Sequence, residues 1–313
     1  MLSADDAAYY RPSLHAACLW LMLATIGKTA VLTLFEGLHA VIAQIVPGIS
    51  VAGLTLNAEL FYKIVLVALP AWLYMRQDNA TRHAARLIAP EKRVWPWTLL
   101  AAVVAVPFAS ALGGLWSHLI GALGGHVAND IAVPASFGEA LLQLAVYALL
   151  PAVCEELLFR GGLMSAWERR GRRRALIVQA VLFALFHESA QGFAVQFVMG
   201  LVLGKIVMDG GSVYAGMLFH GLYNALMLVR SWLIQSESTH IYAIPDSVMA
   251  QLGLVIAGGL ALMAVLCRLR RGDASGSAPR EEMDIGTSIL FMIVILKMLS
   301  LGILDALNVF SVI

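Results

Sequence analysis

Two adjacent carboxylates lie in the middle of a long apolar stretch. Glu155 and Glu156 fall within FGEALLQLAVYALLPAVCEELLFRGGLM, and Arg160 follows them. Glu156 and Arg160 have the i, i+4 spacing and the polarity of an ion pair on a helix. Glu155 points about 100° away from that pair and has no partner in its own segment. Glu156 is therefore expected to be structural, and Glu155 is the carboxylate left for chemistry.

Two later apolar segments supply histidines and an amide. His187 ends FALFH, and His220 and Asn224 are four residues apart in HGLYN, on one helix face. Counted at 1.5 Å per residue from the basic ends of their segments, these residues and Glu155 lie roughly 12–20 Å deep. A lone histidine or asparagine at such depth more often forms a hydrogen bond between helices than takes part in catalysis. Four polar groups in one layer favour a single site.

The composition indicates the environment of this site. Hydrophobic residues make up 60% of the 313 residues and charged residues 13%, against about 25% charged in a soluble domain. This excludes a water-soluble enzyme and a disordered chain. A net charge of +1 does not favour nucleic acid as a partner, and the three cysteines match no metal or redox spacing. The lipid bilayer is the expected surroundings.

Hydrophobic runs predict the fold class, which is all-α: a polytopic membrane helical bundle of about eight or nine transmembrane helices. The runs lie at residues 13–34, 59–75, 95–115, 138–160, 175–190, 192–209, 212–234, 248–267 and 286–304. No basic region precedes a cleavable apolar stretch, so the first run is expected to be a retained span. We expect N-terminal helices over 1–137, a catalytic core over 138–230, and C-terminal helices over 231–313 with an exposed linker near 271–284.

Basic clusters predict the orientation of the chain in the membrane. They lie at 76–93, at 168–174 (ERRGRRR) and at 268–271. With nine spans and a cytoplasmic N-terminus, all three fall on the cytoplasmic side, as the positive-inside rule requires. The depth count from these ends predicts a multi-pass protein of the cell membrane with a cytoplasm-facing active site.

The sequence motifs of the polar segments resemble those of one family. EELLFR (155–160) fits Glu-Glu-x-x-x-Arg, FALFH (183–187) fits Phe-x-x-x-His, and HGLYN (220–224) fits His-x-x-x-Asn. In this order, on successive membrane helices, they resemble the CPBP family of intramembrane proteases, which is related to the type II CAAX prenyl endopeptidases and the Abi proteins. The resemblance covers roughly 138–230.

The resemblance implies an intramembrane endopeptidase that cleaves a membrane-associated or lipid-anchored protein or peptide. Glu155 would activate the water and His187 would help to hold it. His220 and Asn224 would donate to the oxyanion, and Glu156 and Arg160 would support the site. On this mechanism no cofactor is required.

Other functions remain open. One carboxylate and two histidines (Glu155, His187 and His220) also form an ordinary catalytic zinc set, although the helical signature His-Glu-x-x-His is absent. A non-catalytic membrane immunity or chaperone factor could keep the same fold. A transporter would also place ionisable groups at mid-membrane, but no repeated halves are visible. We favour the metal-free glutamate mechanism.

Overall fold

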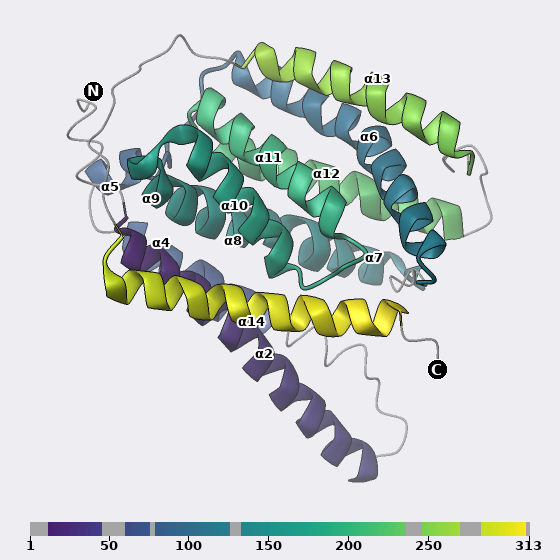
Figure 1. The fold of residues 1–313 in the computed structure, drawn as a ribbon, viewed down its shortest axis with the longest axis horizontal. Helices are drawn as coiled ribbons and strands as arrows, with labels where there is room; N and C mark the ends of the chain where they lie inside the picture. The colour runs from purple at the N-terminus through teal and green to yellow at the C-terminus, as the bar shows by residue number, and fades with distance from the viewer. Residues whose placement is uncertain are drawn as a thin grey trace.

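The computed structural model describes residues 12–45, 60–75, 79–125, 133–235, 246–269 and 283–310. These residues are mostly helical and contain no strand (Figure 1). In chain order the helices are α2 (Leu14–Ile45), η1 (Lys63–Ala68), α4 (Leu69–Met75), α5 (Asn79–Ala84), α6 (Val94–Ala122), α7 (Phe137–Leu144), η2 (Ala145–Leu149), α8 (Leu150–Glu156), η3 (Leu157–Met164), α9 (Ser165–Trp167), η4 (Glu168–Arg170), α10 (Arg172–Phe186), α11 (Phe193–Gly210), α12 (Val213–Gln235), α13 (Val248–Cys267) and α14 (Ile285–Phe310). The predicted all-helical membrane bundle is confirmed.

Each of the nine predicted spans coincides with a helical segment, but fewer meet the criteria for a membrane span. By length and composition, six helical segments in the described parts of the chain can cross a membrane. The helix over 60–75 and α10, with 15 residues, are short for a span. In α12, His220, Asn224 and Arg230 lower the mean hydropathy. His187, His220 and Asn224 thus lie on or at the end of helices that do not meet this measure, whereas Glu155 and Glu156 lie on the candidate span Phe137–Arg170.

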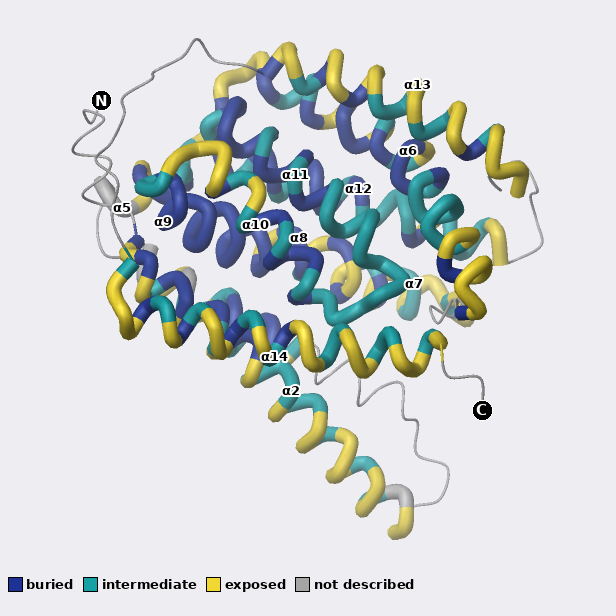
Figure 2. The backbone as a smooth tube through the Cα atoms, viewed as in Figure 1, coloured by how far each residue is buried: buried dark blue, intermediate teal, exposed yellow. Residues whose placement is uncertain are grey.

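The helices form a buried centre between two outer pairs. The centre consists of α8, α10, α11 and α12, which Figure 2 shows as the most buried part of the molecule. On one side α13 packs along α6, and on the other α14 packs along α2. The outer helices expose large apolar side chains such as Leu260, Met263 and Ile303. This pattern suits a bundle that faces lipid and keeps its polar groups inside.

Residues 137–170 form one helix with two π-helical stretches, η2 and η3, on either side of the carboxylates. The wider π turn is rare and often occurs at functional sites. Pro151 lies in the first turn after η2 and has no N–H to offer the carbonyl of Tyr147, four residues earlier. Asn224 Nδ2 donates to that carbonyl at 3.3 Å. The backbone near Pro151 is therefore irregular, and a residue from α12 contacts it.

The basic clusters meet at one end of the bundle. Arg86 Nη2 donates to both carboxylate oxygens of Glu168, at 2.7 and 2.8 Å, which joins the first cluster to the second. Arg93 Nη1 donates to the carbonyl of Arg268 at 3.2 Å, which adds the third. The described parts of all three clusters thus share one end, as the orientation argument requires. Most of the expected linker, residues 271–282, lies outside the described residues.

Candidate active site

Glu156 lies at the centre of a buried ionic cluster. Arg160 Nη1 donates to Glu156 Oε1 at 2.7 Å, and His220 Nδ1 lies 2.9 Å from the same oxygen. The predicted pairing of Glu156 with Arg160 is confirmed. The bond to His220 was not predicted. It requires α12 to approach closely: a Cβ on Gly216 would lie 2.7 Å from Glu156 Oε2.

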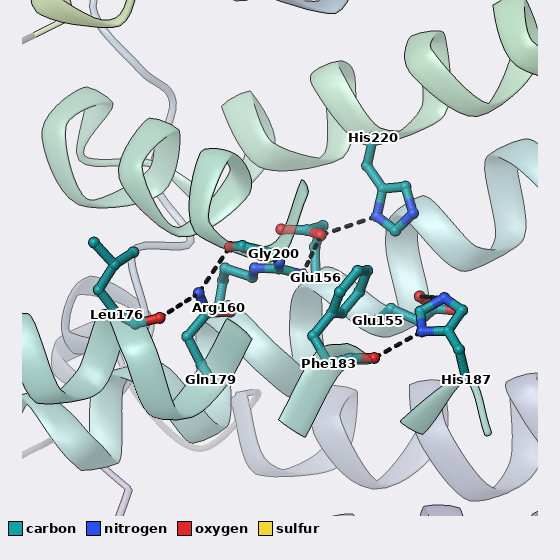
Figure 3. A network of polar contacts seen from close by, with 9 residues as sticks. All are labelled: Glu155, Glu156, Arg160, Leu176, Gln179, Phe183, His187, Gly200 and His220. Atoms are coloured by element: carbon teal, nitrogen blue, oxygen red, sulfur yellow. Dashed lines mark hydrogen bonds and ion pairs between the residues drawn. The ribbon is translucent and has the colours of Figure 1, made fainter. Parts of the chain in front are cut away.

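The cluster extends through Arg160 to the packing of α10 on α11. Arg160 Nη2 donates to the carbonyl of Gly200 at 3.3 Å, and Gln179 Nε2 donates to the same carbonyl at 2.8 Å (Figure 3). Gln179 also donates to the carbonyl of Leu176 at 3.0 Å. Four helices therefore meet at a network of buried polar groups, and this network fixes where Glu156 and Arg160 lie.

Phe183 separates the ionic cluster from the rest of the site. The guanidinium of Arg160 lies 4.4 Å from the centre of its ring. The ring also makes edge contacts with His187 at 4.8 Å and with His220 at 5.9 Å. The phenylalanine of the FALFH segment thus holds both imidazoles in place.

Glu155 and His187 face one another on the other side of Phe183 (Figure 3). His187 Nε2 lies 3.9 Å from Glu155 Oε2, which is too far for a direct hydrogen bond. His187 Nδ1 lies 2.7 Å from the carbonyl of Phe183 and must donate to it, because a carbonyl only accepts. In the neutral ring, Nε2 is then an acceptor. Glu155 Oε2 is buried and has no hydrogen-bond partner among the described residues.

A cavity of about 620 Å³ opens beside these two groups. Glu155, His187 and Asn224 line it, so the structure brings three of the four predicted site residues to one space. His220 is not a lining residue and turns its Nδ1 to Glu156 instead.

Comparison with known families bears on this arrangement. A family model described as type II CAAX prenyl endopeptidase Rce1-like matches residues 137–226. Residues 137–226 carry an Rce1-like domain. The match covers less than a third of the chain and shows that this segment is similar to the type II CAAX prenyl endopeptidases. Such proteases act on membrane-associated prenylated substrates. No curated protein matches the chain.

The cavity, which the matched segment lines together with residues before and after it, extends away from the basic end of the bundle. From Glu155 it runs past Tyr147 and along α12 to Gln235, the last residue of that helix. At this end Trp232 Nε1 donates to Gln143 of α7 at 3.1 Å. The basic loop 168–174 follows the opposite end of the same long helix. The depth count from the sequence predicts that the site faces the cytoplasm, and the side of the membrane stays a prediction.

The packing explains the direction of the cavity. On the basic side of Glu155, the side chains of Phe159, Arg160, Leu163 and Met164 have no exposed surface. They are packed inside the bundle, and the cavity that Glu155 lines lies on the other side, toward Tyr147 and Gln235. Depth along a helix can be counted from the sequence, but the side on which space remains depends on the packing of several helices.

The zinc set considered from the sequence does not assemble in the Rce1-like domain. His220 does not line the cavity, so only Glu155 and His187 of the set do. Within the described ranges, no group of three His, Cys, Asp or Glu side chains could hold a metal ion. These donors do not fit a three-ligand zinc site, and we derive no step through a metal.

Sequence reasoning missed a second ionic cluster next to His187. Glu188 has a left-handed backbone, with φ of 56°, and its carboxylate accepts from Lys28 Nζ at 3.1 Å and from Lys297 Nζ at 2.6 Å. Lys297 also donates to the carbonyl of Thr25 at 2.7 Å. The helices α2 and α14 are thus tied to the loop after α10. The signal available in the sequence was a lysine in each of two otherwise apolar runs.

Proposed function

We propose that the protein hydrolyses a peptide bond of a membrane-associated or lipid-anchored protein or peptide, with Glu155 as the general base. One observation carries the proposal: the unpartnered Glu155 Oε2 and His187 Nε2 lie 3.9 Å apart at the wall of one cavity. The Rce1-like match supports the class of reaction. The residue roles below are part of the proposal.

Glu155 and His187 are suited to hold the same water molecule. Both atoms accept hydrogen bonds, and a water has two O–H groups to donate. Two such bonds of ordinary length span on the order of 4 Å, close to the observed separation. The water oxygen then keeps a lone pair for the substrate carbonyl. Glu155 takes one proton as the oxygen attacks and returns it to the leaving amine.

Asn224 and His220 are the proposed donors to the developing oxyanion. Asn224 uses one N–H on the carbonyl of Tyr147 and has a second at the cavity wall. His220 donates Nδ1–H to Glu156, since an ionised carboxylate only accepts. Its Nε2 can therefore donate to an oxyanion only when the ring is an imidazolium.

Replacing the base tests the proposal. Glu155→Gln is expected to abolish cleavage of a farnesylated CAAX peptide by the protein in detergent or lipid. Glu91→Gln, at an exposed position just before α6, serves as the matched control and should keep wild-type activity. In cells, a membrane protein precursor should accumulate with Glu155→Gln. Wild-type processing by Glu155→Gln, in vitro and in cells, would refute the proposed base.

Chelation tests the metal-free part of the mechanism. A membrane-permeant chelator is expected to leave the activity unchanged, because Glu155 and His187 activate the water without a metal. Activity that is lost on chelation and restored by added zinc would overturn this mechanism while leaving the peptidase class intact.

We further propose that the protein is a multi-pass protein of the cell membrane whose cavity opens on the side away from the basic clusters. On the positive-inside rule the basic end is cytoplasmic. The cavity runs from Glu155 toward the opposite end, so it would admit substrate from the outer half of the membrane.

A further inference from the structure

The cavity has a surplus of positive charge. Three cationic side chains line it, Lys28, Lys63 and Arg230, and Glu155 is the one carboxylate among the residues that line it. Charged residues inside a membrane are expensive and usually face a partner or a pathway. A surplus of cations around one carboxylate therefore favours an anionic group in the occupant of the cavity.

The three cations differ in their surroundings. Lys28 already donates to Glu188, and Lys63 is buried next to the ring of Tyr62, with Nζ 5.9 Å from its centre. Arg230 is half-buried, and no described residue accepts a hydrogen bond from it. A guanidinium has five N–H donors and binds a carboxylate through two parallel bonds. Arg230 is thus the cation with donors to spare.

Arg230 and Asn224 lie on the same wall of the cavity. Both belong to α12, six residues apart, and both line the cavity. Six residues of helix advance about 9 Å along the axis. Their backbone positions are therefore about that far apart along α12, and both side chains line the cavity from there.

We infer that Arg230 binds the free C-terminal carboxylate of the substrate, an inference that rests on the proposed peptidase function. The matched family is described as acting on CAAX sequences, which are C-terminal. Every peptide bond inside such a sequence is within three residues of the chain's carboxylate. Three extended residues span about 10 Å, which agrees with the spacing along α12. Arg230 thus selects a bond close to the end of a chain.

Paired substrates test this inference. The probes are a farnesylated CAAX peptide with a free carboxylate and the same peptide as a C-terminal amide. Wild type is expected to prefer the acid by about ten- to a hundredfold in kcat/KM, mainly through a lower KM. This is the range expected from the loss of one hydrogen bond to a charged group. Arg230→Gln should bring the ratio close to one, and Arg230→Lys should restore part of it. Arg174→Gln, an exposed arginine at the basic end, should keep the wild-type ratio.

Binding to Glu155→Gln separates failure of the subsite from failure of the peptidase. Fluorescence anisotropy should show tighter binding of the acid than of the amide whether or not either peptide is cleaved. Equal affinities would overturn the inference, even if wild type cleaves both peptides. Cleavage of neither peptide, with the acid still preferred in binding, would overturn the peptidase and keep the subsite.

A lipid phosphate could offer similar chemistry, and bilayer composition distinguishes the two sources. In nanodiscs of phosphatidylcholine alone or with phosphatidylglycerol, the affinity for the acid is expected to be the same. Loss of the acid preference when phosphatidylglycerol is present would assign Arg230 to a lipid phosphate and overturn the inference.

Discussion

Glu155 and Glu156 are neighbours in the chain, yet their side chains enter different surroundings. Glu156 accepts from Arg160 and His220 in a region with no exposed side-chain surface. Glu155 turns one oxygen toward His187 at the cavity. Because a helix turns about 100° per residue, adjacent positions can supply one structural and one chemical carboxylate. The two substitutions to glutamine should therefore affect different properties: Glu155→Gln the activity and Glu156→Gln the stability.

Glu156→Gln is expected to destabilise the protein by about 3–5 kcal/mol, since it leaves the charge of Arg160 buried without its partner. The measurement is reversible unfolding in mixed detergent. Glu155→Gln is the matched control and should unfold close to wild type. Equal stability of Glu156→Gln and wild type would contradict the structural role of the cluster.

Asn224→Ala is expected to lower kcat by about 10²–10³ with little change in KM, because a bond to the oxyanion strengthens in the transition state. His187→Ala should leave almost no activity, since the water loses one of its two acceptors. Steady-state kinetics on the CAAX peptide would check that His187→Ala loses more activity than Asn224→Ala. A rise in KM alone for Asn224→Ala, with kcat unchanged, would assign the amide to ground-state binding of the substrate.

At the scale of helices, the close approach of α12 to α8 determines the site. A Cβ on Gly216 would lie 2.7 Å from Glu156 Oε2 and 2.7 Å from Val207 Cγ2. Real Cβ atoms are not found at such distances, so a substitution must displace the ionic cluster or α11. The bond between His220 and Glu156 depends on this glycine.

Gly216→Ala is therefore expected to lower both stability and activity. Gly253→Ala on α13, where a Cβ would meet nothing within 4 Å, is the matched control. An exposed helical glycine replaced by alanine gains about 0.5–1 kcal/mol. Thermal unfolding of the two variants compares them. If Gly216→Ala were as stable as Gly253→Ala, the close packing of α12 on Glu156 would be refuted.

The sequence predicted the depth of the polar groups better than their partners. The i, i+4 pairing of Glu156 with Arg160 and the common layer of the four site residues follow from helix geometry alone. The bond from His220 to Glu156 depends on how closely two helices 64 residues apart in sequence pack together. The Lys28–Glu188 bond joins residues 160 apart. No local spacing reports such contacts.

At the scale of the whole molecule, the basic clusters and the cavity lie toward opposite ends of the bundle. Arg86 and Glu168 join two clusters at one end, and the cavity reaches Gln235 at the other. Packing around Arg160 closes the route between them. The side from which substrate enters is therefore a property of the packed bundle, and it can be measured.

Cysteine labelling tests which side of the membrane the cavity faces. In a Cys267→Ser background, where Cys18 and Cys154 are buried, Ser231→Cys at the cavity is expected to react with an impermeant thiol reagent in intact cells. Arg174→Cys at the basic end should react only in inverted vesicles. Labelling of Ser231→Cys exclusively in inverted vesicles would show that the cavity faces the cytoplasm.

The contacts of Glu188 have a consequence for how small a working fragment can be. Its carboxylate, one residue after His187, is neutralised by lysines from α2 and α14, both outside residues 137–226. A fragment trimmed to those residues would carry Glu188 into lipid without counter-ions and would release the loop that ends at His187. Residues 137–226 therefore need α2 and α14 to neutralise Glu188, and any shortened form of this chain must keep both helices.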